Sequence, residues 1–196
     1  MSVEQEMDSS RRNLLVATSV VGGAGAVAVA VPFVASLTPS DRAKAAGAPV
    51  EADISQLAPG EMMTVEWRGK PVWILRRTPE MLASIESSEP KLSDPESEKS
   101  IQPPYAQNKY RSIKEEYLVT VGICTHLGCS PSEKFKPGAD GGMSADWPGG
   151  FLCPCHGSLF DLAGRVYSSM PAPTNLDVPP HMYLTDTTIL VGEDKA

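Results

Sequence analysis

The sequence predicts a mainly β head domain, built as a sandwich of short antiparallel strands, preceded by one apolar helix that can span a membrane. Short runs rich in Val, Ile, Leu and aromatic residues recur through the C-terminal three quarters of the chain, separated by Gly and Pro. Such punctuation is typical of strands and turns. Near the N-terminus, by contrast, no charged residue occurs between Arg12 and Asp41. The chain therefore divides into an anchor and a head.

The composition fits one globular domain with an appendage. The 196 residues are 41% hydrophobic and 21% charged, which is typical of chains that form a core and not of disordered ones. A single core usually occupies about 100–150 residues. The formal net charge is −7. Because binding to nucleic acid needs clustered Lys and Arg, we expect no nucleic-acid partner.

The N-terminal apolar segment is long enough to cross a bilayer. As a helix, residues 14–37 would extend about 36 Å at 1.5 Å per residue, against a hydrocarbon core of about 30 Å. We expect residues 13–37 to be the transmembrane helix. Residues 10–15, Ser-Arg-Arg-Asn-Leu-Leu, are similar to a bacterial twin-arginine export signal, which would make residues 1–12 the cytoplasmic N-terminus.

The charges around this segment leave its orientation open. Arg11 and Arg12 precede it, while Arg42 and Lys44 follow it, so the positive-inside rule gives a tie. Cleavage is an alternative, because A-x-A sites follow the apolar run, but that run exceeds the roughly 7–15 apolar residues of a signal peptide. We expect retention as an anchor. A chance arginine pair before an ordinary anchor is a further alternative.

The remaining elements follow from hydrophobic period and turn signals. Residues 38–50, rich in Ala with Pro and Gly, predict a flexible linker before the head at 51–196. Period-two alternation predicts a hairpin with its turn at Gly69–Lys70. Thr78, followed by Pro and Glu, predicts the start of a short helix that runs to Ile85. Residues 87–110 predict a long surface excursion. The expected strands are 63–67, 72–75, 117–121, 151–152, 165–167, 182–184 and 188–191.

Two short segments contain all four cysteines and two of the three histidines. Residues 124–129 are Cys-Thr-His-Leu-Gly-Cys, and residues 153–158 are Cys-Pro-Cys-His-Gly-Ser. Each hexad directly follows a predicted strand that can hold it still. Two loops of matching chemistry predict one shared site.

Three kinds of site compete for these six side chains. A structural zinc takes four ligands, two fewer than the candidates present. Two disulfides, with three possible pairings, would leave both histidines without a role. A two-iron cluster with two Cys on one iron and two His on the other uses four of the six and leaves two cysteines to pair.

The two hexads together resemble those of the Rieske iron-sulfur subunits of cytochrome bc complexes, the ubiquinol–cytochrome c reductases. The similarity extends to the twin-arginine anchor, the linker, the region of Lys70-Pro71-Val72 and the stretch Met170-Pro171-Ala172-Pro173. It therefore covers nearly the whole chain. The resemblance implies a Rieske-type antiparallel β-sandwich with a cluster-binding part at about 122–173.

The resemblance also implies one Rieske [2Fe-2S] cluster and the role of each residue around it. Cys129 and Cys155 would form a disulfide that ties the hexads together. Ser158 would donate to a bridging sulfide. Phe160 stands where many members carry a Tyr that donates to a ligand thiolate, so we expect a somewhat lower reduction potential than in the members with Tyr. The implied ligands are Cys124, His126, Cys153 and His156. Also beside the cluster would lie Leu127, the tight-turn glycines Gly128 and Gly157, and a proline loop with Pro171 and Pro173.

By the same resemblance the protein would be an oxidoreductase and translocase subunit of a respiratory chain. It would take an electron and a proton from ubiquinol at His156 and His126 and pass the electron to a c-type cytochrome. Two neutral imidazoles place such centres at roughly −150 to +300 mV, a range that suits a quinol. Implied partners are cytochrome b and a c-type cytochrome, in a parent complex expected to be dimeric.

The implied disulfide places the head in an oxidising compartment, the periplasmic side of a bacterial inner membrane, on a single-pass anchor. One alternative is the Rieske small subunit of a periplasmic molybdenum oxidase. An alternative of another class is a zinc-stabilised module without redox function. A soluble oxygenase ferredoxin is disfavoured by the anchor and the two extra cysteines. We expect residues 130–150 to be a surface insertion, and His181 to be an ordinary packed or surface histidine.

Overall fold

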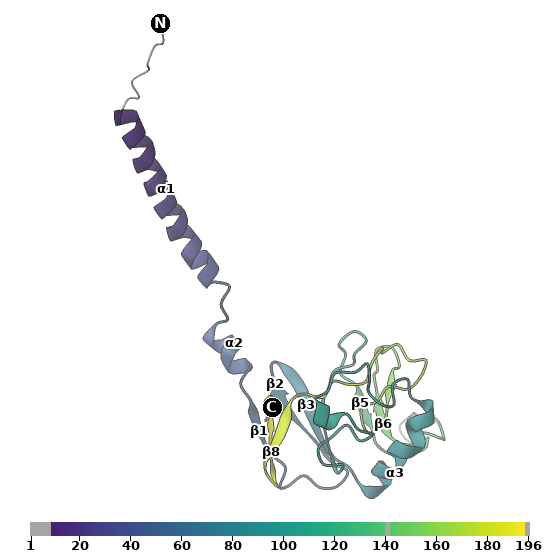
Figure 1. Cartoon of the computed structure of the whole chain (residues 1–196). Coiled ribbons are helices and arrows are strands. Elements are labelled where there is room, and N and C mark those ends of the chain that lie inside the picture. The colour runs from purple at the N-terminus through teal and green to yellow at the C-terminus, as the bar shows by residue number, and fades with distance from the viewer. Residues whose placement is uncertain (1–8, 140–141, 195–196) are drawn as a thin grey trace. The chain divides into compact units, whose positions relative to one another are not determined.

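The computed structural model describes residues 9–139 and 142–194 (Figure 1). The chain forms two compact units, one ending at Ala45 and a head that begins at Ala46. Of the predicted N-terminal segment 1–12, residues 1–8 lie outside the described residues. Residues 140 and 141 of the predicted insertion lie outside them as well.

The N-terminal unit is helical. Helix α1 (Ser9–Ala35) begins four residues earlier than expected, contains Pro32 and has no buried residue. It is long and apolar enough to cross a membrane. Helix α2 (Asp41–Ala46) occupies part of the predicted linker, and the Ser40 hydroxyl accepts a hydrogen bond from the Ala43 N–H at its start. The flexibility of residues 38–50 stays a prediction.

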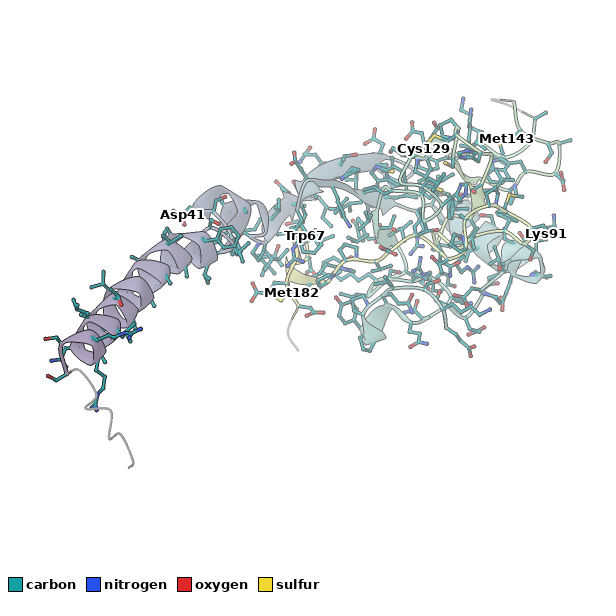
Figure 2. All side chains as sticks on the ribbon, turned by 90° about the horizontal axis from the view of Figure 1, so that it is seen from above. Asp41, Trp67, Lys91, Cys129, Met143 and Met182 are labelled. Carbon is teal, nitrogen blue, oxygen red and sulfur yellow. A yellow bond between two sulfur atoms is a disulfide. The ribbon has the colours of Figure 1, made fainter. Side chains whose placement is uncertain are left out.

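The head contains three antiparallel three-stranded sheets. The first has the order β1 (Val50–Asp53), β9 (Thr188–Val191), β8 (His181–Thr185). The second has the order β2 (Met62–Trp67), β3 (Lys70–Arg76), β4 (Tyr117–Val121), and the third β5 (Ser132–Lys134), β6 (Gly150–Leu152), β7 (Leu159–Phe160). Figure 2 shows Cys129 well away from Trp67 and Met182 of the first two sheets.

Strands β3 and β4 of the second sheet are buried on both faces and separate two cores. Alternate residues of a strand point to opposite faces, and along β3 they divide accordingly. Val72 and Ile74 join a core with the first sheet, whereas Trp73 and Leu75 join a core that contains Cys124 and residues of the third sheet. The continuous apolar run in β3 is therefore explained by burial on both sides.

The β2–β3 hairpin turns one residue earlier than expected. Arg68 and Gly69 occupy its two central positions with φ of 54° and 69°, the left-handed conformation that two-residue hairpin turns of this type require. Trp67 pairs with Lys70 across it. Helix α3 (Pro79–Ser88) is capped as expected, with the Thr78 hydroxyl accepting from the Met81 N–H at 3.3 Å.

The predicted surface excursion at 87–110 is partly wrong. It contains two short 3-10 helices, η1 (Glu89–Lys91) and η2 (Pro104–Ala106), and it buries Leu92 and Ala106. Asp94 is also buried, because its carboxylate accepts hydrogen bonds from the N–H groups of residues 98 and 99 and from the Ser100 hydroxyl. Such local hydrogen bonds let a polar segment pack against the head.

Two further expectations need correction. Residues 165–167 are not a named strand: Val166 and Tyr167 make only isolated bridges, to Phe160 and Leu92. The described part of the 130–150 segment is not purely surface, since it contributes β5 and the buried Trp147, whose indole N–H donates to the Lys134 carbonyl at 2.8 Å.

Candidate metal centre

The two hexads form loops with the same backbone pattern. In each, the first cysteine donates its N–H to the carbonyl five residues later and accepts from the N–H four residues later. Gly128 and Gly157 have φ of 83° and 76°, a conformation that favours glycine. The distances are 2.7 Å for Cys124 N to Cys129 O, 3.1 Å for Gly128 N to Cys124 O, 2.8 Å for Cys153 N to Ser158 O, and 2.9 Å for Gly157 N to Cys153 O.

The first loop is fixed by its supporting strand. β4 ends at Val121, and Gly122 N–H then donates to the Pro71 carbonyl at 2.8 Å. A Cβ at Gly122 would lie 2.2 Å from Cε2 of Trp73, so only glycine allows the chain to pass under this indole. The Trp73 ring in turn stacks on Phe151 of β6, with centroids 5.1 Å apart. The strands that lead into the two hexads therefore share one packed core.

The two first cysteines are buried free thiols. Cys124 and Cys153 are each 2% exposed, and their thiols are within hydrogen-bonding reach of each other. Burial raises the pKa of the Cys124 thiol, while hydrogen bonds from the His126 N–H and the Ser158 hydroxyl act in the opposite direction. Donors aimed at this sulfur favour its thiolate form, which is the form that binds metal.

The two histidines lie outside the thiols. The rings of His126 and His156 are in edge contact, with centroids 4.7 Å apart and planes at 83°. His126 is half-buried and His156 is exposed. The site therefore has its thiols toward the core and its imidazoles toward solvent.

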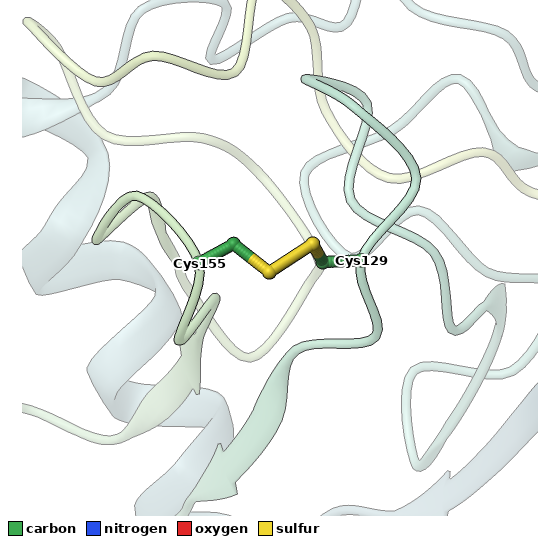
Figure 3. The surroundings of a disulfide bond; sticks show 2 residues. All are labelled: Cys129 and Cys155. Carbon is green, nitrogen blue, oxygen red and sulfur yellow. A yellow bond between two sulfur atoms is a disulfide. The ribbon is translucent and has the colours of Figure 1, made fainter.

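The other two cysteines form the predicted disulfide, Cys129–Cys155, which joins the two loops (Figure 3). The Cys153 sulfur lies within 4.8 Å of both bonded sulfurs. Since disulfide sulfurs are not available as thiolate ligands, the donor set that remains is two thiols and two imidazoles. That set fits a two-iron cluster with Cys on one iron and His on the other, although four such donors also suit a tetrahedral zinc.

Ser158 is fully buried and connects the site to the proline loop. Its oxygen accepts a hydrogen bond from the Ala172 N–H at 3.0 Å, and its hydroxyl hydrogen is available to the Cys124 sulfur. Pro171 and Pro173 on either side of Ala172 are exposed. Ser158 thereby holds the proline loop against the second hexad.

The remaining predicted neighbours differ in their exposure. Phe160 is fully buried in the core that contains both free thiols. Leu127 is 71% exposed at the tip of the first loop. His181 is buried at the start of β8, with Nδ1 2.9 Å from the Pro179 carbonyl oxygen, and it is a packed histidine as expected.

One polar residue in the first hexad and one just beyond the proline loop were not predicted from the sequence. The Thr125 hydroxyl, inside the first hexad, donates to the Thr174 carbonyl at 2.7 Å. Asn175 is fully buried and accepts from the Val166 N–H, while its amide donates to the Asp94 carbonyl and the Ser97 hydroxyl. A polar residue inside a ligand hexad was the available signal for Thr125. Nothing in the local sequence marks Asn175.

The head also has a cavity of about 730 Å³. It is lined by residues such as Met81, Phe135 and Pro148 and by none of the predicted site residues. The candidate metal centre therefore lies at the paired loops and not in this cavity.

Comparison with known families defines the class of protein. Residues 48–180 match the family described as Rieske [2Fe-2S] domain, and residues 1–40 match the family described as Ubiquitinol-cytochrome C reductase Fe-S subunit TAT signal. The head is thus a Rieske [2Fe-2S] domain, which favours iron over zinc at the paired loops. The predicted fold class and cofactor are confirmed.

Full-length relatives define the family more closely. The chain is 60% identical over 195 residues to the ubiquinol-cytochrome c reductase iron-sulfur subunit of Allochromatium vinosum, covering 100% of this chain and 94% of the relative. It is 41% identical over 194 residues to that of Blastochloris viridis, covering 98% of both chains. The chain belongs to the family of ubiquinol–cytochrome c reductase iron-sulfur subunits. A solved chain of a hyperthermophilic respiratory Complex III is similar over 89% of this chain and 96% of its own length, with 26% identity and a TM-score of 0.47.

Proposed function

We propose that this protein is the electron-transfer subunit of a respiratory quinol–cytochrome c reductase. It takes an electron and a proton from ubiquinol and passes the electron to a c-type cytochrome. The observation that carries the proposal is the layered site, in which a half-buried and an exposed imidazole lie outside two buried thiols. It occurs in a chain that aligns over its whole length with relatives of this name.

Four side chains hold the cluster in this proposal: Cys124, Cys153, His126 and His156. The bound cluster supplies reversible one-electron chemistry. The buried thiols exclude water from the inner side, and the loop N–H and the Ser158 hydroxyl stabilise negative charge on the Cys124 sulfur. On the outer side, the ring nitrogen of His156 that does not bind iron can accept a proton from a quinol hydroxyl, because this side chain is exposed. His126, in edge contact with it, can serve the same purpose.

The partners and the topology follow from the family and the anchor. Cytochrome b and a c-type cytochrome are the expected partner subunits, in a dimeric parent complex. Helix α1, with no buried residue, anchors the chain in a bacterial inner membrane. The head lies on the periplasmic side, since the Cys129–Cys155 disulfide suits an oxidising compartment. Residues 38–50 then serve as the joint on which the head moves between donor and acceptor.

Purification of the protein from its native membranes tests this proposal. We expect non-haem iron and acid-labile sulfide in equal amounts, a two-iron EPR signal after reduction, co-purification with a cytochrome b, and ubiquinol-dependent reduction of cytochrome c. Zinc without iron would contradict the redox function. A molybdenum subunit in place of cytochrome b would assign the cluster to an oxidase instead.

A further inference from the structure

The second hexad continues into a hairpin whose closed end lies away from the metal centre. From Ser158 the chain runs through β7, turns at residues 161–165 and returns antiparallel, with Asp161 N–H donating to the Arg165 carbonyl at 2.9 Å and Tyr167 N–H to the Leu159 carbonyl at 3.1 Å. The proline loop follows the returning segment. At this open end the Ala172 N–H meets the Ser158 oxygen. The turn therefore sets the register that brings the hexad and the proline loop together.

The turn is held from within by a buried ion pair. Asp161 and Arg165 are each 1% exposed, and Nε of the arginine lies 2.8 Å from Oδ2 of the aspartate. The other carboxylate oxygen, Oδ1, accepts from the N–H groups of Ala163 and Arg165 at 2.9 and 2.7 Å. Gly164, with φ of 71°, completes the turn.

Two further arginines hold the same turn from outside. Arg77, 2% exposed, donates to the Leu162 carbonyl at 3.1 Å. Its other bonds go to residues 110–115: the carbonyls of Tyr110 and Glu115, both at 2.9 Å, and the Ser112 hydroxyl at 2.8 Å.

Arg111 is fully buried and approaches the carbonyls of residues 163 and 164 at 3.4 Å, while its Nη2 donates to Gln102 at 3.1 Å. Within residues 9–139 and 142–194, neither Arg77 nor Arg111 contacts a carboxylate.

Burying the charged side chains of Arg77 and Arg111 lowers the stability of the fold if their only role is packing. Burial lowers the pKa of both Arg77 and Arg111 to about 10, so both remain charged at neutral pH. The Asp161 carboxylate acts on both guanidinium groups, but without direct contact. A buried charge that no carboxylate contacts is costly, and apolar side chains of similar volume often stabilise a fold as well or better. Apolar side chains cannot, however, fix the direction of carbonyl groups, and the guanidinium fork can.

We propose that Arg77 and Arg111 are positioning residues of the iron-sulfur centre. By holding the carbonyls of the 161–165 turn they fix the hairpin register, and so keep the Ser158 hydroxyl between the Ala172 N–H and the Cys124 sulfur. This inference rests on the proposed function, because its readout is the reduction potential. Loss of register weakens a donor to a ligand sulfur, which lowers the potential.

Arg77→Gln with Arg76→Gln as its matched control tests the proposal in the intact membrane complex. Arg76 is adjacent and carries the same charge, but it binds Glu116 and the Leu57 carbonyl instead of the turn. We expect both variants to lower the thermal midpoint of unfolding. Only Arg77→Gln should lower the EPR-monitored potential, by at least the roughly 28 mV that a threefold change in the one-electron equilibrium constant represents. Equal potentials in Arg77→Gln and wild type, or equal decreases in both variants, would overturn the proposal.

Two milder variants separate position from charge. Arg77→Lys keeps the charge but loses the forked guanidinium, so we expect its reduction potential to be below that of wild type, as in Arg77→Gln. A wild-type potential in Arg77→Lys would contradict a positioning role for the guanidinium. Ser112→Ala removes one anchor of Arg77 without changing charge, and we expect a smaller decrease in the same direction. If Arg77→Gln does not assemble, Ser112→Ala serves as the test, and an unchanged reduction potential in Ser112→Ala would overturn the proposal. Absence of any two-iron signal in the wild type would instead reject the proposed function.

Discussion

Replacing Ser158 by alanine should lower the reduction potential and the stability together. The substitution removes the hydroxyl that is available to the Cys124 sulfur and leaves the buried Ala172 N–H without its acceptor. A hydrogen bond to a charged group contributes about 1.5–3 kcal/mol. The reduction potential depends only on how much stronger this hydrogen bond is in the reduced state than in the oxidised state. If that difference is about 1–2 kcal/mol, the decrease is about 40–90 mV, since about 1.4 kcal/mol corresponds to 59 mV for one electron.

The stability change has a separate cause. An unpaired buried N–H costs about 1–3 kcal/mol, so the free energy of unfolding should fall by that amount. A redox titration followed by EPR gives the potential, and denaturant unfolding of the purified protein gives the stability. Ser168→Ala is the control, because Ser168 is exposed. A Ser158→Ala variant with an unchanged or higher potential would refute the role assigned to this hydroxyl.

Three further predictions concern the buried phenylalanine, the disulfide and the third histidine. Phe160→Tyr should raise the reduction potential relative to wild type, because it adds a hydrogen-bond donor near the ligand thiolates. An unchanged midpoint in a redox titration would exclude the missing hydroxyl as a cause of a lower potential. Replacing Cys129 and Cys155 together by serine should lower the free energy of unfolding by about 3.5 kcal/mol, from the chain entropy of a loop with a sequence separation of 26. Denaturant unfolding measures this, and a loss below about 1 kcal/mol would count against it. Burial lowers the pKa of His181 in the folded protein below the ordinary value of about 6.5, which applies to the unfolded chain. The unfolded chain therefore binds a proton more readily as the pH falls below about 6.5. The free energy of unfolding should decrease in that range, by no more than about 1.4 kcal/mol per pH unit. Unfolding between pH 5 and 7 should show a flatter profile for His181→Asn than for wild type, and identical slopes would exclude this contribution.

The parts of the structure that are encoded locally could be predicted from the sequence. The strand at 117–121 is a short run of β-branched, aromatic and apolar residues, and the cap at Thr78 is a local hydrogen bond. The metal-binding character of the hexads could also be recognised locally, because each combines a thiol and an imidazole at short spacing. The disulfide came from the resemblance, and the structure contains it.

The parts that depend on tertiary contacts could not be predicted. Residues 165–167 have strand composition, yet Val166 finds only an isolated bridge because the partner segment is two residues long. Arg77 and Arg111 read as surface charges, since arginine is rarely buried. Their burial depends on carbonyl groups far away in sequence. The same holds for Ser158, whose second partner, Ala172, lies in another loop.

The most direct test of the central claim is EPR of the reduced protein purified with ¹⁵N-labelled histidine. If Cys124, Cys153, His126 and His156 bind a Rieske cluster, the signal should show hyperfine coupling to nitrogens of two imidazoles, and it should vanish in Cys124→Ala. A two-iron signal without histidine nitrogen coupling, or a protein that contains zinc and no iron, would contradict the account.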